Sequence, residues 1–98
     1  MPDLKNPIFD EKASIIDKYG IMQSMADEFE AAYRYIKLAS VTSDERTKAV
    51  YRDIAKEELV HAGEFMAILG ITSPDVLALF EKGKEEVFEF LKKMENEQ

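Results

Sequence analysis

Apolar side chains recur every three to four residues along most of this chain, a spacing that predicts helices. Two polar breaks interrupt the pattern, one near residues 41–44 and one near residues 70–74. The first residues contain two prolines and show no apolar period. We therefore expect an all-α fold in one domain, residues 1–98, with an extended arm over 1–9 and helices over 10–41, 43–69 and 74–94.

The breaks contain residues that begin and end helices. Thr42 or Ser43 can cap the second helix, because a side-chain oxygen at this position accepts a hydrogen bond from the first turn. Gly70 is suited to end that helix, since glycine is common just after a helix C-terminus. Ser73-Pro74 is a strong start for the third helix, with serine as the cap and proline in the first turn.

Each of the first two helices has an apolar stripe that is broken by ionisable residues. The first stripe is Ile21, Met25, Glu28, Ala32, Tyr35 and Ala39; the second is Tyr51, Ile54, Glu58, His61, Phe65 and Ile68. A carboxylate on a core-facing stripe is costly unless something compensates its charge. We expect Glu28, Glu58 and His61 to share a ligand for this reason.

Helix lengths place these residues together. Two helices joined by a short turn pack antiparallel. Glu28 lies 15 residues before Ser43 and Glu58 lies 15 residues after it. Equal arms bring the two carboxylates side by side, and His61 shares the face of Glu58 because it is three residues further along the helix.

Carboxylate and imidazole donors suit iron, manganese or zinc. Di-iron carboxylate bundles take one Glu from each of two helices and Glu-x-x-His from each of the other two. This chain supplies half of that set. We therefore expect two copies to dimerise into a four-helix bundle with a di-iron site between them, and such an oxygen-rich site would also accept calcium or zinc in a crystal.

The composition limits the other functions. The net charge is −7, which favours cations and disfavours nucleic acid and anionic membranes as partners. There is no cysteine, so disulfides and thiolate metal sites are excluded. The chain has no long apolar run and no signal-peptide pattern, and we expect it to be cytoplasmic.

The segment over about residues 20–70 resembles the encapsulated ferritins, a branch of the ferritin-like superfamily. The similar stretches are D-E-F-E-A-A-Y-R-Y at 27–35 and E-E-L-V-H-A at 57–62. The resemblance implies a ferroxidase that oxidises Fe(II) to Fe(III) with dioxygen for iron storage. It also implies ring-shaped decamers of five dimers that work inside an encapsulin nanocompartment.

The resemblance assigns roles to individual residues. Glu28, Glu58 and His61 match the ferroxidase ligands of that family. Asp27 and Glu30 match acidic positions through which metal enters, with Asp in place of the family's Glu at 27. Tyr35 matches a tyrosine near the centre.

One departure from the family lies at the C-terminal end, which lacks a Gly/Ser linker with an apolar targeting peptide. The chain is then a truncated form, a domain of an encapsulin fusion, or a protein that is not targeted in that way.

Two other readings of the sequence stand beside this one. A rubrerythrin-like peroxide reductase would use the same centre. A helical oligomerisation or cargo module would leave the acids in solvent, with Glu57 and Glu64 on the surface and His61 as an ordinary core residue. With 13 Glu among 98 residues, a Glu three positions before the single His arises by chance roughly one time in eight.

Overall fold

The computed structural model describes residues 13–97, and for residues 13–18 the backbone only. It contains three helices: α1 (Ala13–Val41), α2 (Glu45–Thr72) and α3 (Pro74–Asn96). Within this range there is no strand, which confirms the all-α expectation. The extended arm over residues 1–9 and the start of the first helix at residue 10 lie outside the described residues.

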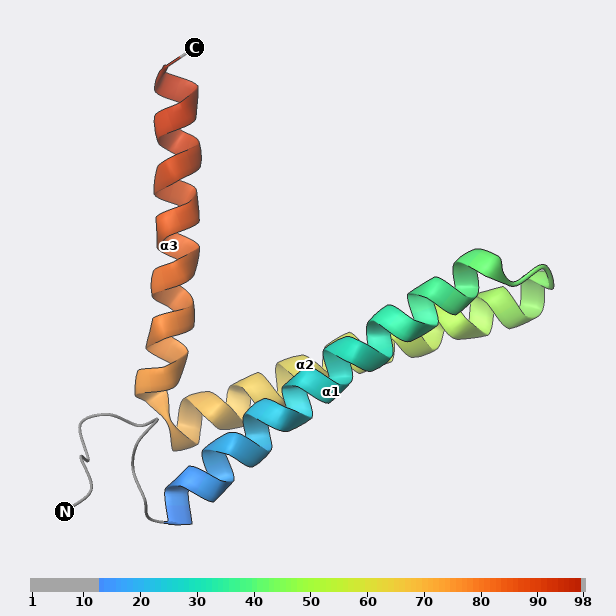
Figure 1. Ribbon diagram of the computed structural model, residues 1–98, viewed down its shortest axis with the longest axis horizontal. Coiled ribbons are helices and arrows are strands. Elements are labelled where there is room, and N and C mark those ends of the chain that lie inside the picture. The colour runs from blue at the N-terminus through green and yellow to red at the C-terminus, as the bar shows by residue number, and fades with distance from the viewer. Residues whose placement is uncertain (1–12, 98) are drawn as a thin grey trace.

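The helices form an L-shaped layer. α1 and α2 pack antiparallel as a hairpin, and α3 leaves the open end of the hairpin and runs away from it (Figure 1). The shortest dimension is 17 Å, which leaves room for one layer of helices, each about 10–12 Å across. The radius of gyration is 18.2 Å, against about 13 Å for a compact domain of this length. A single chain therefore leaves most of its helical faces uncovered.

A narrow seam joins α1 to α2. Its fully buried residues are spaced seven apart on each helix, and several are alanines that allow the backbones to approach closely: Met25, Ala32, Ala39, Ala55, Ala62 and Leu69. The α1 half of the expected core, Met25, Ala32 and Ala39, is confirmed. On α2 the expected stripe was shifted by one residue, since Ile54, His61 and Ile68 lie beside the seam and Ala55, Ala62 and Leu69 lie in it.

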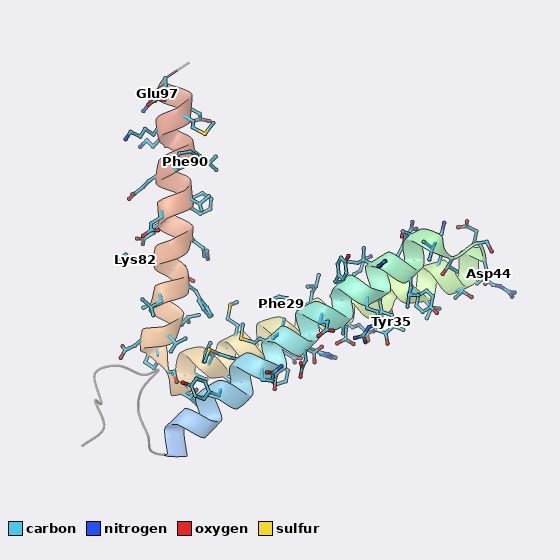
Figure 2. All side chains as sticks on the ribbon, in the orientation of Figure 1. Phe29, Tyr35, Asp44, Lys82, Phe90 and Glu97 are labelled. Atoms are coloured by element: carbon cyan, nitrogen blue, oxygen red, sulfur yellow. The ribbon has the colours of Figure 1, made fainter. Side chains whose placement is uncertain are left out.

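The turn between α1 and α2 is capped by Asp44. Its carboxylate accepts hydrogen bonds from the Thr47 backbone N–H at 3.0 Å and the Thr47 hydroxyl at 2.7 Å. Asp44 lies at the far tip of the hairpin (Figure 2). The expectation of a Thr42 or Ser43 cap is wrong, because Thr42 donates its hydroxyl back to the Leu38 carbonyl of α1. The second helix consequently begins at Glu45 and not at residue 43.

The elbow between α2 and α3 corrects the expected role of Gly70. α2 continues through Gly70 to Thr72, and no described glycine has a positive φ. A Cβ at Gly70 would lie 2.7 Å from Cδ2 of Leu77. Glycine therefore lets α3 approach α2 closely at this point and does not terminate the helix. Met25, Leu69 and Val76 form the small core of the elbow, and α3 runs through Gly83 to Asn96, two residues beyond the expected end.

The elbow core predicts the cost of shortening Leu69. Leu69 is completely buried, so Leu69→Ala should destabilise the protein by about 2–5 kcal/mol through lost burial and the cavity left behind. Ile68→Ala is the matched control, because the neighbouring Ile68 is 46% exposed and its loss should cost much less. Chemical denaturation of both variants measures the difference, and equal destabilisation would contradict the assigned core.

The Asp44 cap predicts a pH-dependent stability. The hydrogen bonds from the Thr47 side chain and backbone hold the pKa of Asp44 below its ordinary value of 3.8. A carboxyl with a lowered pKa stabilises the fold above its unfolded pKa, and this contribution is lost as the pH falls through the lower folded value. Asp44→Ala should lower the thermal midpoint at neutral pH, and the difference from wild type should shrink below about pH 4. Ser43→Ala, measured by the same circular dichroism melts, should have little effect.

Candidate metal centre

The seam fixes where Glu28 points. Glu28 follows the buried Met25 by three residues and precedes the buried Ala32 by four, so it lies at one edge of the seam. Its side chain is only 19% exposed. The atom Oε2 is fully buried, and no hydrogen-bond partner for it exists among the described residues. A buried carboxylate oxygen without a donor is unfavourable, and a cation would compensate it.

α2 contributes two more ligand atoms. Glu58 and His61 are one helical turn apart, and Oε2 of Glu58 lies 3.9 Å from Nδ1 of His61. Oε2 of Glu28 lies 3.6 Å from the same nitrogen across the seam. Both distances exceed a normal hydrogen bond. The three groups converge without satisfying one another.

The equal-arm register that was expected from the sequence is present. Tyr35 and Tyr51 each lie eight residues from Ser43, and their rings stack with centroids 5.9 Å apart and planes inclined by 29°. Figure 2 shows Tyr35 on the hairpin between the site and the turn. Because Glu28 and Glu58 lie seven residues from these two tyrosines, the same register brings their carboxylates together.

The proximity of the carboxylates alters the acidity of Glu58. A side-chain hydrogen bond shared with Glu28 raises the pKa of Glu58 above its ordinary value of 4.5, and burial and the charge of Glu28 raise it further. The His61 imidazole acts in the opposite direction with the smallest effect. The protein is therefore arranged so that two neighbouring negative groups repel each other when no cation lies between them.

The donors fit a first-row metal ion. One atom from each of Glu28, Glu58 and His61 lies within 4.8 Å of the others. Two ligands that each lie about 2.1 Å from one ion are separated by at most about 4.2 Å, so the distances from His61 require little adjustment. Nitrogen and carboxylate oxygen suit iron, manganese or zinc. One chain offers three side chains, which leaves the coordination shell of two ions incomplete.

The other acidic candidates lie outside this cluster. Asp27 is exposed and accepts a hydrogen bond from Gln23 at 2.9 Å. Glu30 is exposed and pairs with Arg34 at 3.6 Å on the same helix. Glu57 and Glu64 are also exposed. Their role in metal uptake stays a prediction, because in a single chain each is engaged locally or faces solvent.

The aromatic contact shows what sequence reasoning missed. The stripe of α1 singled out Tyr35 but gave Tyr51 no role. The stacking of Tyr35 on Tyr51 places both rings on the metal-site face, one heptad from the carboxylates. The equal distances of the two tyrosines from the turn were the signal that could have paired them.

A comparison with curated proteins finds one similar protein, a ferritin-like-encapsulin shell fusion protein of Pyrococcus furiosus. The identity is 37% over 62 residues, which cover 63% of this chain and 18% of that protein. The chain thus spans less than a fifth of that relative. No family model and no solved structure matches the chain. Among the described residues, no helix is long and apolar enough to cross a membrane.

Removal of the Glu58 charge should separate stability from metal binding. A raised pKa means that folding favours the protonated form, so this stabilisation is present below the unfolded pKa and is lost as the pH rises through the folded value. Glu58→Gln mimics the protonated form. Without metal at neutral pH it should be at least as stable as wild type, while affinity for Co(II) should fall by about 100-fold or more.

The matched control for this prediction is Glu57→Gln, an exposed neighbour on the same helix. It should leave both thermal stability and Co(II) titration near wild type. Equal loss of Co(II) binding in the two variants would show that general surface charge, and not the cluster, binds the ion.

Proposed function

We propose that the chain is a ferroxidase that oxidises Fe(II) at a centre completed by a second copy. The observation that carries the proposal is the buried, unpartnered oxygen of Glu28 beside Glu58 and His61. Two copies related by a two-fold axis would place two such sets face to face. The result is the ligand set of a di-iron carboxylate bundle, with one Glu and one Glu-x-x-His from each chain.

Dimerisation through this face also answers the packing of the hairpin. The site lies on a face whose apolar neighbours are incompletely covered, including Ile68 and Leu38, which are 46% and 36% exposed. Covering apolar surface stabilises an assembly by about 25 cal/mol for each Å² removed from water. The dimer that completes the metal set therefore also buries surface that one layer of helices exposes.

The residues support oxidation of iron in three ways. The net charge of −7 attracts Fe(II), the substrate, to the surface. Glu58 and His61 of each chain hold one ion, and the Glu28 carboxylates lie close enough to reach both. Negative oxygen donors favour the more highly charged Fe(III) over Fe(II), so the ligands assist the loss of an electron to dioxygen.

The similarity to a protein named as a ferritin-like-encapsulin shell fusion supports the same proposal. We extend it to association with an encapsulin shell, where the oxidised iron would be stored, and to an annular decamer of five dimers. Co-expression with an encapsulin shell protein, followed by isolation of intact shells, tests the association. Absence of the chain from the shells would contradict it.

Replacement of His61 tests the activity. His61→Ala should reduce the initial rate of Fe(II) oxidation by at least about 100-fold, because each centre loses two of its ligands in the dimer. The rate is followed by ultraviolet absorbance of Fe(III) after aerobic addition of Fe(II). Circular dichroism should be unchanged, since the His61 side chain is 47% exposed.

The matched control is Glu64→Ala, which removes an exposed acid one turn further along α2. It should oxidise Fe(II) at close to the wild-type rate. Wild-type rates in both variants would contradict the proposal. Faster turnover with hydrogen peroxide than with dioxygen would identify the same centre as a peroxide reductase.

A further inference from the structure

The hairpin has a second exposed apolar face, opposite the metal centre. On each helix the metal ligands follow a seam residue by three positions, and a second set follows by four, which puts it on the other side of the seam. This set consists of Met22, Phe29, Ile36, Leu59 and Met66, and we call it the back face. Phe29, Ile36 and Leu59 are 49%, 54% and 48% exposed. The dimer that completes the metal centre does not cover it.

The back face is hollowed where α3 begins. A cavity of about 190 Å³ is lined by Met22, Met25, Ala26, Phe29 and Phe80. Four of these residues come from α1 and the last comes from α3. The lining is almost entirely apolar, so an apolar side chain suits the cavity better than a polar ligand.

Gly63 lies on the same side of the hairpin. It is four residues after Leu59 and three before Met66, which places it beside the back face of α2. Glycine in a helix interior costs about 1 kcal/mol relative to alanine. A Cβ at Gly63 would meet no described atom within 4 Å. Nothing within the hairpin explains this glycine, whereas close approach of another helix would explain it.

α3 carries a matching surface. Phe80, Val87 and Met94 recur every seven residues, and Leu91 lies beside them. All four are at least 39% exposed. Figure 2 shows Phe90 on the part of α3 that stands clear of the hairpin, and no described element covers this stripe.

The charges at the edges of the two surfaces are opposite. Arg52 is seven residues before Leu59, and Lys56 is seven before Gly63, so both border the back face. Glu86 borders the stripe of α3. None of these three residues makes an ion pair within the part of the chain that the structure describes. An unpaired basic edge and an unpaired acidic edge favour contact between copies.

We propose that the back face is a second interface between copies of this chain, occupied by α3 of another copy. The apolar stripe of α3 would lie along Phe29 and Leu59, close to Gly63. This interface uses no metal ligand and lies on the opposite side of the hairpin from the centre. A chain with two self-interfaces on opposite faces assembles beyond the dimer.

Sedimentation velocity of surface variants tests this interface. Wild type with metal should form assemblies larger than a dimer. Val87→Asp and Phe29→Asp should each stop at the dimer, because a charge in an apolar contact is strongly unfavourable. Both side chains are more than 45% exposed, so the helical signal should survive. Sedimentation of either variant at the wild-type rate would overturn the proposal.

Gly63→Ala gives a second test with two opposite signs. It should raise the thermal midpoint when combined with Val87→Asp, because alanine favours the helix. In the otherwise native chain it should weaken assembly by about tenfold, because the added methyl group overpacks a close contact. Gly20→Ala is the control, since it has equally open space on α1 and lies away from both faces. Unchanged assembly of Gly63→Ala would count against the close contact.

The two interfaces can fail separately. In a His61→Ala background the back face should still join copies, and adding Val87→Asp should yield monomers. A monomeric His61→Ala chain at high concentration would overturn the back-face interface while leaving iron oxidation by wild type unaffected. Conversely, wild-type oxidation rates in His61→Ala would contradict the ferroxidase proposal and leave the sedimentation results unchanged.

Discussion

A carboxylate oxygen of Glu28 is buried at the edge of the helical seam with no donor within reach in the described chain. The rest of the arrangement depends on this deficit. Glu58 cannot relieve it, because a second carboxylate adds repulsion and its own pKa is raised. His61 is 3.6 Å away and more exposed, so it relieves the charge only in part. A cation between the three side chains removes the conflict, and the acidic protein attracts cations.

The seam makes this deficit possible. Alanines at 32, 39, 55 and 62 let α1 and α2 approach closely, and the larger residues are displaced to both sides. One side receives the metal ligands and the tyrosine pair, and the other receives the back face. Because a single layer of helices has no covering elements, each face depends on another molecule for burial. Site chemistry and packing therefore both require assembly.

The sequence predicted the helices and the pairing of Glu28 with Glu58 from the equal arms about Ser43. It could not predict the seam of α2, since Ala55 and Ala62 are weak hydrophobic signals beside Ile54 and Ile68. It also assigned Gly70 to a helix end, because close approach of Leu77 from α3 is visible only in three dimensions. Asp44 was overlooked as a cap because three consecutive polar residues can all accept the same hydrogen bond.

The central claim is that one chain holds half of a di-iron centre. Native mass spectrometry of protein loaded anaerobically with Fe(II) tests it most directly, because it counts metal ions in each oligomeric species. The account predicts two iron ions for every two chains in dimers and larger assemblies, and little iron on monomers. Monomers that carry their full complement of iron, or dimers that carry none, would contradict it.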